Sequence, residues 1–475
     1  MPKPAQKTKQ VIQKKEKEVS KNALKVGLEI HGYLLTKEKL FCSCATPSSS
    51  KKDLAPNTSI CPVCTGQPGA KPMLPNKTAV ENVIKIAAML NSSINAEKKL
   101  VWQRKHYSWP DLPKGYQNSM SGAYSIPLGE KGNFLGINIR SVHLEEDPAA
   151  WNPETGEIDY NRSGLPLVEI VTEPDFTSAD QVIEWLKNLL LTLSYARAID
   201  KISGIKADVN VSTGGERVEI KNINSLDAIK KAIEFEAQRQ QKEPAQRQTR
   251  RFDDKTGKTI LMRTKEQEDD YRFIPDPDLP VLIIKKELAQ KIMQNLPESP
   301  KKKLEKLIKQ HKIDKKNADI LTQNLEIVEF FEKVAEKIDP KFALPWVTIE
   351  LLRVLNWNKK TLDEVNINPQ HFIELLQLVK EGKVTELKAK QTLNDFVPQS
   401  FSPKEKLQGH EKISQEKEIE SFCKQAIEKN PQAAQDYKAG KQEALNFLLG
   451  EVMKISQRRA DYKVAREAMI KLLKR

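Results

Sequence analysis

Residues 26–35 read VGLEIHGYLL, in which apolar side chains alternate with polar or small ones, the pattern of a β-strand that buries one face. The same alternation returns in GINIRSVHLEED at 136–147, PLVEIVTEPD at 166–175 and KADVNVSTGGERVEIKN at 206–222. Glycine and proline separate these stretches, as expected of strands joined by turns. The sequence therefore predicts a sheet-rich region that extends to about residue 288.

Helical periodicity interrupts this region at Thr78–Leu90 and Ser178–Ala196, where apolar residues recur three and four positions apart. Beyond Pro300 glycine becomes scarce, Lys and Glu become abundant, and the helical spacing persists. A polar stretch around Pro398 and Pro403 separates a last helical segment. We expect an α+β fold, with a mixed-sheet N-terminal domain followed by an all-helical domain and a small helical tail domain.

The length of 475 residues suggests roughly three domains at about 150 residues each. The expected divisions are a basic tail at 1–25, the mixed domain at 26–292, a helical domain at 293–400 and the tail domain at 401–475. The net charge of +14 favours a polyanionic partner such as nucleic acid, although a solubilising lysine-rich surface would look the same. No apolar run is long enough for a membrane span or a signal core, so a cytoplasmic protein is expected.

Four of the five cysteines gather in one short segment, as Cys42 and Cys44 followed by Cys61 and Cys64. Within each pair both thiolates can reach one tetrahedral ion, and four sulfur ligands favour zinc. Such a closed site would stabilise the loop that carries the cysteines without catalysing a reaction. Two reactive or disulfide-linked pairs are the alternative, and iron–sulfur ligation is disfavoured because nothing else indicates electron transfer.

A dispersed group of acids provides a second candidate site. Glu29 and His31 lie two residues apart on the first predicted strand, so their side chains point to the same side. Carboxylates from neighbouring strands could complete an oxygen-rich site that suits Mg²⁺. The candidates for those carboxylates are Glu145, Glu146, Asp147 and Glu169. Each acid could instead be a surface group or the partner of one of the many lysines and arginines.

Residues 104–117, RKHYSWPDLPKGYQ, combine cations, aromatic side chains and turn formers. Such a loop could hold phosphates and stack on a base, or it could be a surface loop whose aromatics cover a core edge. The chain has no G-x-x-x-x-G-K-[ST] motif, so ATP would require a different cradle. It also lacks a Gly-x-Ser-x-Gly elbow and a Ser-Ser-Lys amidase signature, so this chain should not itself act as an amidase.

The last helical segment combines apolar stripes with a cationic side. The stripes, expected to be core faces, are Leu445, Leu448, Leu449, Val452 and Met453, and then Val464, Ala468 and Leu472. The cations are Lys454, Arg458, Arg459, Lys463, Arg466, Lys471, Lys474 and Arg475. They could contact an RNA backbone, or they could form an ordinary solvated face.

The chain resembles the B subunit family of tRNA-dependent amidotransferases from about residue 26 to the C-terminus. The motifs that carry this resemblance are VGLEIHGYL, KLFCSC, CPVCTGQPGAKPMLPN, RKHYSWPDLPKGYQ, HLEED, DYNRSGLPLVEIVTEPD, VEIKNINS, QTRRFDDKTGKTILMRTKEQEDDYRFIPDPDLP and NFLLGEVMK. The resemblance implies a heterotrimer with an amidase subunit that frees ammonia and a small bracing subunit. The present subunit would use ATP to activate the side-chain carboxylate of Glu-tRNA or Asp-tRNA, and ammonia would then yield the amide.

The resemblance also implies residue roles. It implies Mg²⁺ on Glu29, His31, Glu146 and Glu169, structural Zn²⁺ on Cys42, Cys44, Cys61 and Cys64, and contacts to ATP phosphates from Arg104 and Lys105. Two departures from the family pattern affect the expected site. HLEED is followed by Pro148-Ala149-Ala150 in place of Ala-Gly-Lys, which removes a cation, and residues 202–210 lack two consecutive glutamates.

Two other functions remain open from the residues. A non-catalytic RNA-binding protein with a zinc knuckle would explain the charge and the cysteines but not the acid and histidine cluster. A carboxylate–amine ligase acting on a small molecule would explain that cluster but not the basic C-terminal helices.

Overall fold

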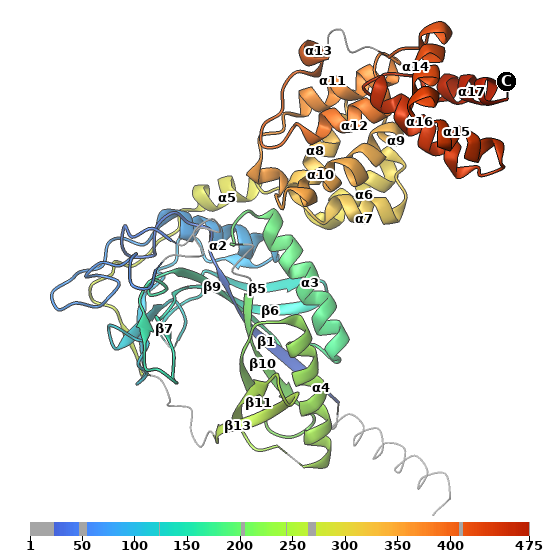
Figure 1. Cartoon of the computed structure of the whole chain (residues 1–475). Coiled ribbons are helices and arrows are strands. Elements are labelled where there is room, and N and C mark those ends of the chain that lie inside the picture. Colours follow the sequence, from blue (N-terminus) through green and yellow to red (C-terminus); the bar gives the residue numbers. More distant parts are fainter. Residues whose placement is uncertain are drawn as a thin grey trace, which may run out of the picture. The chain divides into compact units, whose positions relative to one another are not determined.

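The computed structural model describes residues 23–46, 55–122, 124–200, 205–243, 245–264, 272–407 and 412–474. The chain divides into two compact units, residues 1–299 and residues 300–475 (Figure 1). Two expectations lie wholly or largely outside the described residues, the basic tail at 1–25 and the cation Arg475, and so does the start, 202–204, of the departure at 202–210. None of the described helices is both long enough and apolar enough to cross a membrane.

The first unit is built on one large mixed sheet, as the alternating sequence stretches predict. Its described strands are β1 (Lys25–Tyr33), β2 (Ser93–Ile94), β3 (Gln103–His106), β4 (Tyr116–Ser119), β5 (Gly129–Phe134), β6 (Ile137–Glu146), β9 (Pro166–Thr172), β10 (Ile205–Ser212), β11 (Val218–Ile223), β12 (Gln248–Asp253), β13 (Lys258–Thr264) and β14 (Arg272–Pro275). The order across it is β13-β12-β11-β10-β1-β9-β6-β4-β3-β14. A separate hairpin pairs β7 (Ala150–Trp151) with β8 (Ile158–Asp159).

This sheet must be curved, because its two edge strands are consecutive in the sequence. Ten strands spaced by about 4.8 Å would hold β13 and β14 about 43 Å apart in a flat sheet. The chain from Thr264 to Arg272 contains eight residue steps, which span at most about 29 Å when fully extended. The edges must therefore bend toward each other, which gives the sheet one concave face.

Helices cover one face of the sheet and bury its apolar side chains. They are α2 (Lys77–Met89), α3 (Ala179–Tyr195) and α4 (Leu226–Lys242), with α5 (Lys286–Gln294) packed on α2, and Figure 1 shows α3 and α4 along the sheet. On β1 the side chains of Val26, Leu28 and Ile30 are at most 1% exposed within this core. The alternate residues Glu29 and His31 therefore lie on the opposite face, which these helices leave open.

The two helices predicted in this region are confirmed as α2 and α3, with Asn76 and Ser178 as their N-cap residues. A third helix, α4, was not predicted. Ser225 caps it, and α4 forms the crossover between the parallel strands β11 and β12. Its sequence has a low apolar content, and only its Ala228, Ile229, Ala232 and Ile233 positions mark the buried stripe. A helix with so few apolar residues gives only a weak helical periodicity in the sequence.

The second unit is helical, as predicted from Pro300 onward. Its helices are α6 (Pro300–His311), α7 (Lys315–Thr322), α8 (Leu325–Ala335), α9 (Pro340–Pro345), η2 (Trp346–Leu351), α10 (Leu352–Trp357), η3 (Leu362–Glu364), α11 (Pro369–Lys380), α12 (Glu386–Asn394), α13 (Pro403–Lys406), α14 (Glu416–Lys429), α15 (Pro431–Lys438), α16 (Glu443–Ile455) and α17 (Tyr462–Leu473). Residues of α14–α17 form their own apolar core.

The stripe predicted on α16 is confirmed, because all five of its residues are buried. On α17 the buried face is shifted by one position. Ala465, Ala468, Met469 and Leu473 are buried, whereas Val464 and Leu472 are only half-buried at its border. Of the predicted cations, Lys454, Arg458, Lys463, Arg466, Lys471 and Lys474 are exposed and Arg459 is half-buried.

Candidate active site and cysteine cluster

Strand pairing brings three of the candidate side chains together on the open face of the sheet. His31 on β1 pairs in register with Glu169 on β9, and Glu169 pairs with His143 on β6. Glu145 lies two residues beyond His143 and therefore points to the same face. The nitrogen or oxygen atoms that His31, Glu145 and Glu169 can offer to a metal all lie within 4.8 Å of one another.

This group, which we call the acidic trio, is compact and nearly buried. The Nε2 atom of His31 lies 3.9 Å from Glu145 Oε2 and 4.0 Å from Glu169 Oε1. The side chains of Glu145 and Glu169 are 1% and 10% exposed. The second carboxylate oxygen of Glu169 is buried without a hydrogen-bond partner among the described residues, an arrangement that is costly unless a ligand satisfies it.

The electrostatics of the trio favour an added cation. Burial, followed by the neighbouring charge of Glu145, raises the pKa of Glu169 well above its usual value. Burial also tends to raise the pKa of Glu145, but Lys105, His31 and a hydrogen bond from Ser119 outweigh it and hold that pKa below normal. Two adjacent buried carboxylates can both ionise only when further positive charge neutralises them. The donor set of one imidazole and two carboxylates thus fits a divalent ion.

Two of the four residues assigned to magnesium by resemblance, Glu29 and Glu146, lie outside the trio. Successive residues of a strand point to opposite faces, so Glu145 and Glu146 cannot both face His31. Glu146 accepts hydrogen bonds from the Lys114 ammonium and, at 2.9 Å, from the backbone N–H of Asn118.

Glu29 belongs to a neighbouring acidic group on the same face. Its carboxylate lies within 4.8 Å of those of Asp208 and Glu219. The Lys221 ammonium partly neutralises this group, at 2.8 Å from Asp208 and 2.9 Å from Glu219.

Arg104 and Lys105, both assigned to ATP phosphates, also point to opposite faces of the sheet. The Arg104 guanidinium donates to Asp276 at 3.0 and 3.2 Å and to Asp278 at 2.8 Å. The charge of Lys105 instead helps to lower the pKa of Glu145 and opposes the rise in the pKa of Glu169. Lys105 is therefore the one of the two that lies on the face of the trio.

The loop after HLEED retains a cation, although the lysine typical of the family is missing there. Arg162 lies 3.1 Å from Asp147 and donates to the carbonyl oxygens of Pro148 and Ala149 at 3.0 and 2.5 Å. Asp147 in turn accepts a hydrogen bond of 2.7 Å from the Tyr33 hydroxyl. Sequence reasoning missed Arg162, although it stands in the quoted motif DYNRSG.

The four cysteines converge as their spacing predicts. All four sulfur atoms lie within 4.8 Å of one another, so the cluster could hold a metal ion. A hydrogen bond from Cys42, together with the Cys61 amide and the charge of Lys39, lowers the pKa of the Cys64 thiol to about 4 against the effect of burial. The fit to a thiolate-binding ion is good, because this site already favours one deprotonated sulfur.

A buried lysine completes the cysteine cluster and was not predicted. Lys39 is only 1% exposed, and its ammonium lies 3.5 Å from Cys64 Sγ and 3.1 Å from the Tyr160 carbonyl oxygen. Among the described residues no carboxylate forms an ion pair with it. Because a buried cation needs a compensating anion, the thiolates are its natural partner.

Comparison with known proteins identifies the family of the chain. The model of the GatB/GatE catalytic domain matches residues 24–290, and that of the GatB domain matches residues 329–473. Proteins named as the B subunit of aspartyl/glutamyl-tRNA(Asn/Gln) amidotransferase are similar along nearly their whole length. Those of Methanopyrus kandleri and Methanothermobacter thermautotrophicus are each 42% identical, covering 93% and 92% of this chain and 96% and 97% of their own.

The corresponding protein of Methanocaldococcus jannaschii is 40% identical over 95% of this chain and 97% of its own length. The match to the catalytic-domain model includes the residues of the acidic trio and of the cysteine cluster. The chain belongs to the GatB/GatE family.

Proposed function

We propose that this chain is the B subunit of a glutamine-dependent amidotransferase that converts Glu-tRNA(Gln), Asp-tRNA(Asn) or both to the amides. The observation that carries the proposal is the acidic trio on the open face of the sheet, in which one carboxylate oxygen of Glu169 has no hydrogen-bond partner among the described residues. Similarity to B subunits over nearly the whole chain supports the same function. Neither the zinc-knuckle RNA-binding protein nor the small-molecule ligase has comparable support.

The reaction has two steps. An oxygen of the side-chain carboxylate on the tRNA attacks the γ-phosphorus of ATP, and the bond to ADP breaks. Ammonia then attacks the carbonyl carbon of the acyl phosphate, phosphate leaves, and a proton is released. Mg²⁺ at the trio would neutralise the phosphate charge and orient the γ-phosphoryl group. His31, Glu145 and Glu169 would hold that ion, while Lys105 would present a cation on the same face.

The remaining parts fit a complex that acts on tRNA. Ammonia would come from an amidase subunit, with a small subunit joining the two. The exposed cations of the C-terminal helices would contact the phosphate backbone of the tRNA. Zn²⁺ on Cys42, Cys44, Cys61 and Cys64 would tie the loop that carries them to the sheet without taking part in the chemistry.

The test exploits the alternation at positions 145 and 146. Glu145→Gln and Glu146→Gln remove the same charge from adjacent residues, and each variant is co-purified with the amidase and small subunits. Glu145→Gln should lower amide formation on charged tRNA by roughly 100-fold, because a metal ligand is lost, while glutaminase activity persists. Glu146→Gln should reduce it less. A larger loss in Glu146→Gln would exclude the trio as the metal site, and no amide from the wild-type complex would refute the function.

A further inference from the structure

Lys206 lies on the open face of the sheet, directly beside His31 of the acidic trio. The two residues are partners in the antiparallel pairing of β10 with β1, and on its other side His31 pairs with Glu169 of β9. Residues directly opposite each other on neighbouring strands point to the same face, with Cβ atoms about 5 Å apart. Lys206 therefore borders the trio, although no role was predicted for it from the sequence.

The ammonium of Lys206 is half-buried and has no ion-pair partner. Among the described residues it makes no hydrogen bond or ion pair, and the ring of Tyr33 lies 5.8 Å from it. Burial lowers the pKa of Lys206, and the carboxylates of Asp147 and Asp208 oppose this effect only in part. An ammonium has three donors and no acceptor, so an anionic ligand would offset the cost of its burial.

The carboxylates of Asp147 and Asp208 are already paired with other cations. Arg162 lies 3.1 Å from Asp147, which also accepts a hydrogen bond from the Tyr33 hydroxyl. The Lys221 ammonium lies 2.8 Å from Asp208. Lys206 is therefore not needed as the ion-pair partner of either carboxylate, and its charge remains available to a ligand on the open face.

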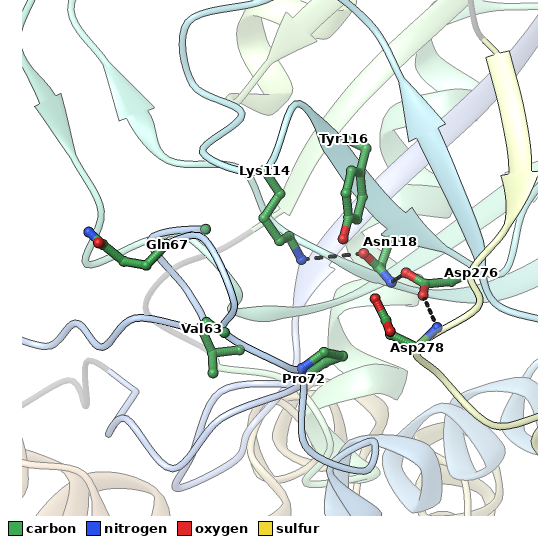
Figure 2. A pocket seen from close by; sticks show the side chains of 10 residues that line it. Val63, Gln67, Pro72, Lys114, Tyr116, Asn118, Asp276 and Asp278 are labelled. Atoms are coloured by element: carbon green, nitrogen blue, oxygen red, sulfur yellow. Dashed lines mark hydrogen bonds between the residues drawn. The ribbon is translucent and has the colours of Figure 1, made fainter.

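Lys114 is a further lysine close to HLEED, but it points away from the trio. Its ammonium donates to Glu146 and, at 3.3 Å, to the side-chain oxygen of Asn118 (Figure 2). The next residue of β4, Ser119, donates to Glu145 on the open face. Because successive residues of a strand point to opposite faces, Lys114 and the pocket that it lines lie on the other face from the trio.

Lys206 and Lys105 flank the trio on its two sides. In the strand order β10-β1-β9-β6-β4-β3, Lys206 belongs to the first strand and Lys105 to the last, and the trio lies on the strands between them. In phosphoryl transfer the attacking and leaving oxygens lie roughly in line, on opposite sides of the phosphorus. With Lys105 at the ATP phosphates, the attacking carboxylate would approach from the side of Lys206.

We propose that Lys206 binds the side-chain carboxylate of the glutamyl or aspartyl group on the tRNA. This inference deepens the proposed function and rests on it. The carboxylate must come close to the γ-phosphate, although the two anions repel each other. The ammonium offsets this repulsion and donates a hydrogen bond to the carboxylate oxygen that does not attack phosphorus. The amide of the product carries no charge, so Lys206 holds the product less tightly than the substrate.

The experiment measures equilibrium binding of charged tRNA to the complex with the amidase and small subunits. Mg²⁺ is present, whereas ATP and glutamine are left out so that no reaction occurs. The probes are Glu-tRNA(Gln) and Gln-tRNA(Gln), which differ only in a carboxylate and an amide, and the pair Asp-tRNA(Asn) and Asn-tRNA(Asn). Wild type should bind the acid form of its substrate about tenfold more tightly than the amide form, equivalent to 1.4 kcal/mol. Lys206→Met should abolish this preference, and Lys206→Arg should retain most of it.

Lys25→Met is the matched control. Lys25 is exposed, lies on the same face of β1 as His31, and pairs with Ser212 of β10. It is six residues from His31, or about 20 Å along the strand. This variant loses the same charge from the same pair of strands and should keep the wild-type preference. If Lys206→Met instead loses affinity for the acid and amide forms by the same factor, Lys206 has only a structural role and the proposal is overturned.

Binding of ATP decides whether the anion is the carboxylate or a phosphate. Lys206→Met should bind ATP with Mg²⁺ as tightly as wild type, whereas Lys105→Met should bind it more weakly. Weaker ATP binding by Lys206→Met, together with an unchanged preference for the acid form, would assign Lys206 to the phosphates and overturn the proposal. A wild type that does not distinguish the acid from the amide in either pair would overturn it as well.

Failure of this proposal is distinguishable from failure of the proposed function. If the wild-type complex forms amide and Lys206→Met retains the wild-type kcat/KM for charged tRNA, only the role of Lys206 is lost. If the wild-type complex forms no amide on any charged tRNA, the function itself is lost.

Discussion

At the residue scale, the buried ammonium of Lys39 sits where metal-bound thiolates would need a counter-charge. Replacing it with methionine keeps most of the length of the side chain but removes the donor to Cys64. We expect Lys39→Met to weaken Zn²⁺ binding by about 10- to 100-fold, as loss of a group that contacts a metal ligand typically does. Competition with a chromophoric chelator measures this affinity.

Lys37→Met is the matched control, since Lys37 is exposed and only two residues away. Its zinc affinity should equal that of wild type. Equal affinities for all three proteins would show that Lys39 does not stabilise the metal-bound thiolates.

A second prediction at this scale concerns Cys423 in α14, whose thiol lies 3.6 Å from the Ala465 carbonyl oxygen of α17. Burial raises its pKa to about 11. The folded state therefore keeps a proton that the unfolded state loses from about pH 8.5 upward. Stability should fall as pH rises through the interval between these two values, because the native state binds more protons.

The measurement compares wild type with Cys423→Ala in denaturant titrations at pH 7 and pH 10. The difference in free energy of unfolding between the two pH values should be larger for wild type. The thiol should also resist alkylation at pH 8 until the chain unfolds. Rapid alkylation of Cys423 in the native protein would contradict its burial.

At the scale of elements, the capping of α4 decides whether the crossover from β11 to β12 is well ordered. The Ser225 hydroxyl accepts the Ala228 amide at 3.1 Å. Ser225→Ala should cost about 1 kcal/mol of unfolding free energy, and Ser225→Gly only a few tenths. Urea titration followed by circular dichroism tests both. A glycine variant less stable than the alanine variant would show that capping is not the main role of Ser225.

At the scale of the whole molecule, the cations of α17 should act through long-range charge. The double variant Lys463→Glu/Arg466→Glu should raise the KM for charged tRNA and reduce the slope of log affinity against log salt by about one for each phosphate that the variant no longer neutralises. The kcat should change little, because these residues are far in sequence from the trio and lie in a different compact unit.

The control is Lys337→Glu/Lys341→Glu, which produces the same change of net charge on exposed lysines outside the C-terminal helices. Binding of tRNA is measured by filter retention at several salt concentrations. An equal loss in both double variants would attribute the effect to net charge alone and remove α17 from the proposed RNA contact.

The family, the fold class and the convergence of the four cysteines could all be predicted from the sequence. These predictions rest on strand alternation, helix spacing and the Cys-x-Cys and Cys-x-x-Cys pairs. Such patterns are local, because they involve only residues that are close together in the chain. Helix α4, whose apolar content is low, helix α5 and the half-buried border of α17 are among the local features that were not predicted. The predicted division of the second unit at about residue 400, and the metals themselves, stay predictions.

Only the tertiary structure decided which of two adjacent residues joins the site. The sequence could not choose between Glu145 and Glu146, or between Arg104 and Lys105, because the choice depends on which strand pairs with which and in what register. The same holds for Lys39 and Arg162, whose partners lie more than ten residues away in the chain. Such contacts form only when segments far apart in the chain come together, so no short stretch of sequence contains them.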